Sequence, residues 1–181
     1  MKTILKWYLL IHGFLACGQV LESDSLLMWK SNRFLIWKDF KGVPMPIKMH
    51  NKAGTGMYIG YSYSQEEGHP PNFKIYNYFD KCRSWSLTKD ERLLEHEQLH
   101  FDISELYVRK TRKYFDSLNA MNVLDPKEYL RAKEKIAKES YKLQQEYDED
   151  VLLDFPRQDK WRKLIDKELE KLKEYEFIPE E

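Results

Sequence analysis

Two histidines and a glutamate at fixed spacing are the residues of this chain best suited to chemistry. They stand in the segment His96-Glu97-Gln98-Leu99-His100, which follows the pattern H-E-x-x-H. On a helix, residues four apart lie about 40° apart around the axis, so His96 and His100 point the same way and can hold one zinc ion. Glu97 lies about 100° from His96, within reach of a metal-bound water but outside the ligand set. The pattern predicts metal-assisted hydrolysis with Glu97 as the general base.

The H-E-x-x-H pattern is short, so its alternative is two histidines that are four residues apart by chance. The neighbouring residues favour the metal site because they predict a long helix around it. Thr88-Lys89-Asp90-Glu91 fits a capping box at the start of that helix, and apolar residues recur as far as Val108. We expect the helix to span roughly residues 89–118.

The other elements must form a frame that positions this helix. Residues 57–64 and 73–79 alternate in polarity, which predicts two antiparallel strands. A shorter strand is expected at 33–37, a turn at 52–56, and two more helices from Pro126 to about Val151 and from Pro156 onward. The residues expected to share one face of each strand are Met57, Ile59, Tyr61 and Tyr63, and Phe73, Ile75, Asn77 and Phe79. The predicted fold class is α+β, a small antiparallel sheet followed by the H-E-x-x-H helix and two further helices.

Composition and the N-terminus restrict the class of protein. The chain has 181 residues with 30 basic and 30 acidic side chains, so its net charge gives no reason to expect a nucleic-acid partner. Residues 1–18 have the outline of a signal peptide, with two lysines, a short apolar run and small residues at the end. We expect a tether at 19–25, a single domain at 26–181, and an exported product that is periplasmic, secreted or an outer-membrane lipoprotein.

The processing of this segment has two possible routes. Signal peptidase can cut after Gly18, or Cys17 can become a lipid-bearing N-terminus, because residues 14–17 resemble a lipobox. An uncleaved apolar helix is the alternative to both. In either route Cys82 has no intrachain partner, which excludes a disulfide framework. We expect Cys82 to be a small buried side chain, with a reactive thiol as the alternative.

A catalytic zinc site usually has three protein ligands, so the two histidines need a third. Glu105 follows on the same helix, but it lies about 140° around the axis from His100 and cannot reach the same metal. The acids near the end of the second predicted helix are candidates: Glu146, Glu149, Asp150 and Asp154. Glu146 and Asp150 lie one turn apart, which suits a ligand and a partner that orients a histidine. The alternative is a solvated helix end.

Several segments together resemble a bacterial family of uncharacterised zinc peptidases of the gluzincin-like type. These are the H-E-Q-x-H-F-D-I run at 96–103, the I-W-x-D-F-x-G run at 36–42, Ser84-Trp85, Tyr147-Asp148 and the Q-x-x-W run at 158–161. The resemblance implies a zincin-like fold, zinc as the cofactor and an exported protein. The chain also departs from the family pattern, since Val151 and Leu153 stand where the family has Thr and His. If that histidine is a ligand in the family, this chain has lost it.

We therefore expect a zinc metallopeptidase that acts on a peptide or protein outside the cytoplasm, with Zn²⁺ on His96 and His100. The alternative is a non-catalytic binding or structural protein on a metallopeptidase fold. Tyr147 is a candidate donor to the oxyanion, or else a structural tyrosine in a helix seam. The strand at 57–64 is expected either to bind an extended peptide along its edge or to lie inside the sheet. A thiol enzyme based on Cys82 is the weakest option, because no histidine stands in a recognisable relation to it.

Overall fold

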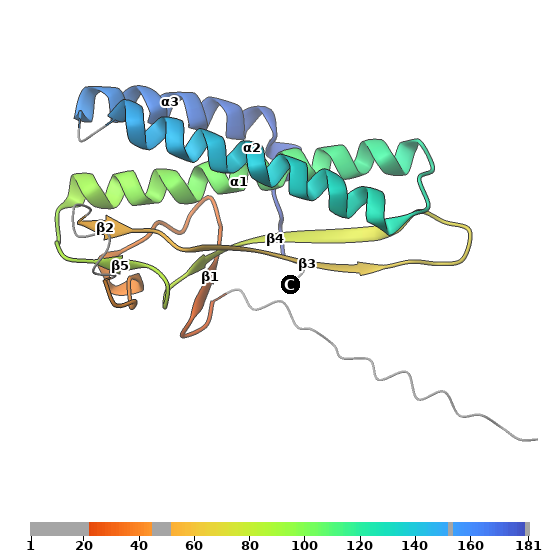
Figure 1. The fold of residues 1–181 in the computed structure, drawn as a ribbon, viewed down its shortest axis with the longest axis horizontal. Helices are drawn as coiled ribbons and strands as arrows, with labels where there is room; N and C mark the ends of the chain where they lie inside the picture. The colour runs from red at the N-terminus through yellow and green to blue at the C-terminus, as the bar shows by residue number, and fades with distance from the viewer. Residues whose placement is uncertain (1–21, 45–51, 152–153, 180–181) are drawn as a thin grey trace, which may run out of the picture.

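The computed structural model describes residues 22–44, 52–151 and 154–179. A small antiparallel sheet forms one layer, α1 lies directly over it, and α2 and α3 lie over α1 (Figure 1). The strands are β1 (Leu26–Met28), β2 (Ala53–Gly54), β3 (Met57–Ser64), β4 (Asn72–Asp80) and β5 (Trp85–Ser86). The helices are α1 (Glu91–Ala120), α2 (Pro126–Val151) and α3 (Phe155–Lys171), with short 3-10 turns η1 (Trp37–Asp39) and η3 (Lys173–Tyr175). The predicted α+β class and its three helices are confirmed.

The main sheet has the order β1-β4-β3, and all its pairs are antiparallel. Met57 lies opposite Phe79 and Tyr63 opposite Phe73, so the two predicted faces share one side of the sheet. On that side, Ile75 and Phe79 are buried beneath the helices. The alternation of residue types along both strands thus predicted correctly which residues share a face.

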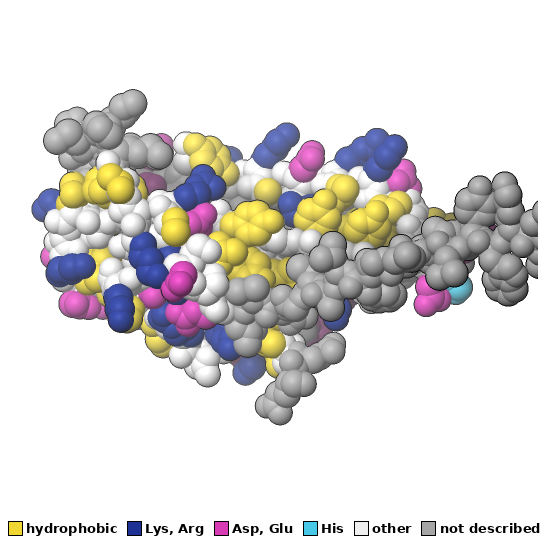
Figure 2. Space-filling model, turned by 90° about the horizontal axis from the view of Figure 1, so that it is seen from below, with side chains coloured by type: hydrophobic (Ala, Val, Ile, Leu, Met, Phe, Trp, Pro, Cys, Tyr) yellow, Lys and Arg dark blue, Asp and Glu magenta, His cyan; other side chains and the backbone are white. Residues whose placement is uncertain are grey.

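Within the described residues β3 is an edge strand, so the alternative of an interior strand is wrong. None of its eight residues is charged. On the outer face of the sheet, Tyr58 stacks on Tyr78 with ring centroids 6.1 Å apart, and apolar side chains gather on this face (Figure 2).

Helix α1 is the centre of the molecule because it is apolar on opposite sides. Towards the sheet it buries Phe101 and Val108. Towards α2 and α3 it buries Leu99, Ile103 and Leu106 against one cluster of apolar side chains. A helix packed on both sides is held rigidly, which suits it to carry a site that needs fixed geometry.

Two local predictions are wrong. Residues 33–36 do not form a strand; the carboxylate of Asp39 accepts hydrogen bonds from the Arg33 guanidinium and from the Ile36 N–H, which winds the chain into η1. Helix α1 is capped by Asp90, whose carboxylate accepts from the Leu93 N–H at 3.0 Å, and not by Thr88. Asp90 replaces Thr88 as the cap because its side chain lies closer to the free N–H groups of the first helical turn.

The segment expected to be a turn at 52–56 contains β2, which pairs with β5 to form a second, two-stranded sheet. Cys82 is exposed rather than buried, because it lies in a tight turn after β4 whose N–H groups are held by Asp80. Gly42 fits against this turn, where a Cβ would lie 2.6 Å from the Cys82 carbonyl oxygen.

The N-terminal predictions lie mostly outside the described residues, which begin at Glu22. This applies to the signal peptide at 1–18 and to Cys17. Glu22 falls within the predicted tether, yet its carboxylate accepts from Lys81 Nζ at 2.8 Å. Among the described residues, no helix has both the length and the apolar composition needed to cross a membrane.

Candidate metal centre

The seam between α1 and α2 brings together three side chains that can hold a metal ion, His96, His100 and Asp148. The two Nε2 atoms of the histidines lie 3.1 Å apart. The Asp148 Oδ1 atom lies 3.2 Å from Nε2 of His96 and 2.9 Å from Nε2 of His100. Three potential ligand atoms thus converge on one point.

The spacing of α2 explains why Asp148 faces the histidines. Gln144, Tyr147, Asp148 and Val151 recur at intervals of three and four, so they share one face of the helix. Tyr147 and Val151 are fully buried against Leu99 and other apolar residues of α1 and α3. Packing of this apolar pair fixes the rotation of α2 and turns Asp148 towards α1.

Gln144 determines how His100 presents its ring. The Gln144 side-chain N–H donates to the backbone oxygen of His100 at 2.9 Å, so its carbonyl oxygen is the atom 2.5 Å from Nδ1 of His100. That oxygen can only accept, so Nδ1 must carry the proton. The lone pair of the neutral ring is therefore on Nε2, which faces His96 and Asp148.

His96 is held by aromatic contacts instead. Its ring stacks on Tyr147 with centroids 4.6 Å apart, and Tyr147 packs against Trp161. Within the described part of the chain, Nδ1 of His96 and the hydroxyl of Tyr147 are buried without a hydrogen-bond partner. Burial and the nearby carboxylates of Asp148 and Glu97 raise the pKa of Tyr147, so its hydroxyl keeps its proton at neutral pH.

Asp148 is ionised in this setting. Burial opposes the charge, but the imidazoles of His100 and His96, which donate to this carboxylate when they are protonated, outweigh burial and hold the pKa of Asp148 below its usual range. Burial likewise favours neutral His100, yet the hydrogen bond to Asp148 and the charges of Glu97 and Asp148 raise the pKa of its imidazole. The cluster thus carries the negative charge that a cation needs, beside two imidazoles.

Glu97 lies next to the cluster but is not one of its three members. Its side chain is buried, and one carboxylate oxygen accepts a hydrogen bond from the Thr55 hydroxyl at 2.6 Å. Thr55 stands between β2 and β3, so the strand layer orients the carboxylate from below. The negative charge of Glu97 is one of the causes that raise the pKa of the His100 imidazole.

The acids proposed as third ligands lie elsewhere. Glu146 pairs with Lys142 on the exposed side of α2. Asp150 binds Arg157 and the indole N–H of Trp161, and Asp154 caps α3. Glu105 pairs with two arginines away from the histidines, as its angle on the helix predicted.

Sequence reasoning therefore missed three polar residues of the site: Thr55, Gln144 and Asp148. The Tyr147-Asp148 pair, which matches the family pattern, is the one sequence signal that points to Asp148 as the third member of the site. The Leu153 position, where the family has a histidine, lies outside the described residues. In comparisons with known proteins, no family model, no curated protein and no solved structure matches this chain.

Proposed function

We propose that this protein is a zinc-dependent hydrolase that cleaves peptide bonds outside the cytoplasm, on a zincin-like fold. The observation that carries the proposal is the convergence of His96, His100 and Asp148 beside the separately held carboxylate of Glu97. Two histidines and one carboxylate leave a fourth position of a tetrahedral zinc for water, which is the arrangement of catalytic rather than structural zinc sites.

The distances fit zinc. Ligand atoms about 2.0–2.2 Å from a tetrahedral zinc lie roughly 3.3 Å from one another. The three atoms here are separated by 2.9–3.2 Å, so an ion needs only a small spreading of the side chains. Mixed imidazole and carboxylate ligands also suit zinc better than calcium or magnesium, which prefer oxygen alone.

In this proposal each residue of the chain has a separate task. Bound zinc supplies an acidified water and polarises the substrate carbonyl. Glu97 takes a proton from the attacking water and later delivers it to the leaving amine nitrogen, while Thr55 keeps its carboxylate in place. Tyr147 positions the ring of His96 through their stack.

The decisive experiment combines metal analysis with one substitution. Purified protein should bind close to one zinc per chain, and Glu97→Gln should keep the zinc but lower hydrolysis of a peptide library by about 10²–10⁴-fold, the usual contribution of a general base. Glu95→Gln, an exposed neighbour, is the matched control. Wild-type protein that stays metal-free in excess zinc, or Glu97→Gln with full activity, contradicts the proposal.

The second candidate is a binding or structural protein that holds zinc without catalysis. It is favoured by the enclosure of the histidines, whose side chains are only 12% exposed. In addition, two cavities of the described residues, of about 440 and 390 Å³, include none of the three ligands in their lining. Bound zinc with no hydrolysis of any peptide or cell-wall substrate supports this candidate.

Export is part of the proposal and has its own test. Mass spectrometry of the exported protein should find either an N-terminus at Gln19 or a lipid on Cys17. An intact Met1 on exported protein contradicts both routes.

A further inference from the structure

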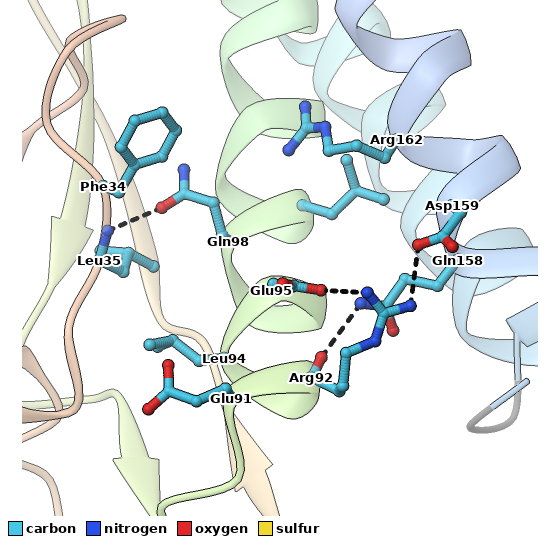
Figure 3. A pocket seen from close by; sticks show the side chains of 11 residues that line it. Phe34, Leu35, Glu91, Arg92, Leu94, Glu95, Gln98, Gln158, Asp159 and Arg162 are labelled. Atoms are coloured by element: carbon cyan, nitrogen blue, oxygen red, sulfur yellow. Dashed lines mark hydrogen bonds and ion pairs between the residues drawn. The ribbon is translucent and has the colours of Figure 1, made fainter. Parts of the chain in front are cut away.

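A groove runs along the side of α1 that does not carry the metal ligands. Two cavities, of about 440 and 390 Å³, lie between α3 and the segment at 29–35. Phe34 and Arg162 line both cavities, so the two are neighbours along the groove. Figure 3 shows the first cavity, with α1 along its floor, Phe34 and Leu35 on one side and Arg162 of α3 on the other. Each volume falls in the range of ligand pockets, about 300–1,000 Å³.

The floor and one wall of the groove are partly apolar. Leu35, Leu94 and Leu99 line the first cavity, and Leu169 lines the second. Phe34 stands between them with 66% of its surface exposed. An exposed phenylalanine beside a leucine-lined hollow is a surface that a large apolar side chain of a ligand can cover.

The charges of the groove decide between a cationic and an anionic ligand. Seven carboxylates and four basic side chains line the two cavities. All four basic groups already have acidic partners: Arg92 pairs with Glu95 and Asp159, and Arg162 with Asp102 and Asp166. Arg109 and Lys173 likewise pair with glutamates.

The same ion pairs engage six of the seven carboxylates, so the acids differ from the bases only in number, and their excess gives the lining a net negative charge. The seventh carboxylate, Glu91 in the first cavity, is exposed and has no ion pair with any of the described residues. Charge complementarity thus favours a cation.

We propose that this groove binds an extended peptide segment in which lysine or arginine alternates with large apolar residues. The apolar side chains cover the exposed Phe34 and the half-buried Leu94, and the basic groups lie against the acids of α1 and α3. Two neighbouring cavities along one groove suit an extended chain better than a single small molecule. This site lies apart from the metal ligands, so the inference does not depend on the proposed hydrolysis.

The test uses two peptides of alternating leucine and lysine, or leucine and glutamate, six residues long, acetylated and amidated to remove terminal charges. Calorimetric titration is done with a chelator present, so that no metal takes part. The lysine peptide should bind, and its affinity should fall as salt screens the charges. The indole N–H signal of Trp29, which lines the second cavity, should shift in NMR spectra.

Two sets of variants locate the binding. Glu91→Gln with Asp159→Asn removes two charges from the groove and should weaken the lysine peptide about 3- to 30-fold, because each exposed ion pair contributes up to about 1 kcal/mol. Phe34→Ala should weaken it through the lost apolar contact. The matched control, Asp116→Asn with Glu134→Gln, removes two exposed charges elsewhere on α1 and α2 and should leave affinity unchanged.

Several outcomes overturn the proposal. Equal binding of the glutamate peptide shows that charge does not select the ligand. Equal weakening in the control variant shows unspecific attraction. No binding of either peptide, or a dimer in light scattering that Phe34→Ala dissociates, shows that the groove serves another occupant, in the last case a second copy of this chain.

Discussion

Asp148 is essential to the proposed metal site, because one of its carboxylate oxygens faces both imidazoles. The same atom that would bind zinc lies within 3.2 Å of each Nε2 atom. No other carboxylate of the described residues joins this cluster. Replacing Asp148 should therefore affect zinc far more than replacing any neighbouring acid.

We predict that Asp148→Asn lowers zinc affinity by more than the about 10–100-fold that is typical of residues behind the ligands. The amide keeps the size of the side chain but loses the charge that a cation needs. Competition with a fluorescent chelator measures the affinity. Glu146→Gln, Asp150→Asn and Asp154→Asn serve as controls and should bind zinc like the wild type. A large loss in any of these, with Asp148→Asn unaffected, would return the third ligand to one of the earlier candidates.

Gln144 provides a second test of the proposed metal site at the level of a single residue. Gln144→Leu removes the acceptor for Nδ1 of His100 and should weaken zinc binding about 10–100-fold, because the ring is no longer held in one tautomer and orientation. Gln145→Leu, the exposed neighbour, is the control and should have no effect. Circular dichroism checks that both variants fold. Unchanged affinity in Gln144→Leu would show that packing alone orients the ring.

At the scale of elements, a buried ion-pair network joins α1 to the C-terminal segment. Glu105 is 2% exposed and lies 3.1 Å from Arg109 and 3.0 Å from Arg112. Arg109 also donates to the Leu169 carbonyl and pairs with Glu176, and Arg112 donates to the Tyr175 carbonyl. These contacts connect the end of α3 and η3 to the central helix.

We predict that Glu105→Gln lowers the free energy of unfolding by about 3–5 kcal/mol, because Arg112 loses its charged partner and Arg109 keeps only Glu176. Urea denaturation followed by circular dichroism measures the change. Glu134→Gln, an exposed substitution on α2, should stay within about 0.5 kcal/mol of the wild type. A loss for Glu105→Gln as small as that of the control would mean that water or nearby carbonyls already satisfy the arginines.

The elements with a strong period were predictable from sequence, and those held by single side chains were not. Residues 57–64 and the helix from Pro126 to Val151 have the predicted bounds, because alternation and apolar stripes act over many residues. The strand predicted at 33–37 does not form, since the apolar run of these residues carries no sign that the Asp39 carboxylate accepts from the Ile36 N–H and starts η1.

The residues of the candidate metal centre also divide into those that a local pattern predicts and those that only tertiary packing brings together. His96, Glu97 and His100 were found because their spacing within one helix is fixed. Asp148 and Thr55 come from other parts of the fold, and their approach depends on how α2 and the link between β2 and β3 pack against α1. No local pattern contains that information, so among five nearby acids the sequence could not indicate which one faces the histidines.

At the scale of the whole molecule, the proposed ligands belong to two helices, so zinc should tie α1 to α2. We predict that zinc raises the unfolding temperature and that a chelator reverses the rise. Free zinc at about 100 times its dissociation constant adds about 2.7 kcal/mol to stability when the unfolded chain does not bind it. Differential scanning calorimetry measures the shift, and His96→Ala is the control that should not respond. A zinc effect of equal size in His96→Ala would place binding elsewhere.

Helix α1 borders both the metal ligands and the groove, and this shared helix has a thermodynamic consequence. Any movement of α1 that one ligand favours changes the free energy with which the other binds. By linkage the two effects must be equal: a groove peptide that tightens zinc binding about tenfold must itself bind about tenfold more tightly to the zinc-loaded protein. The ratio of the peptide dissociation constants measured without and with zinc gives the coupling free energy between the two sides of α1. A ratio of one would show that α1 transmits no change from one side to the other.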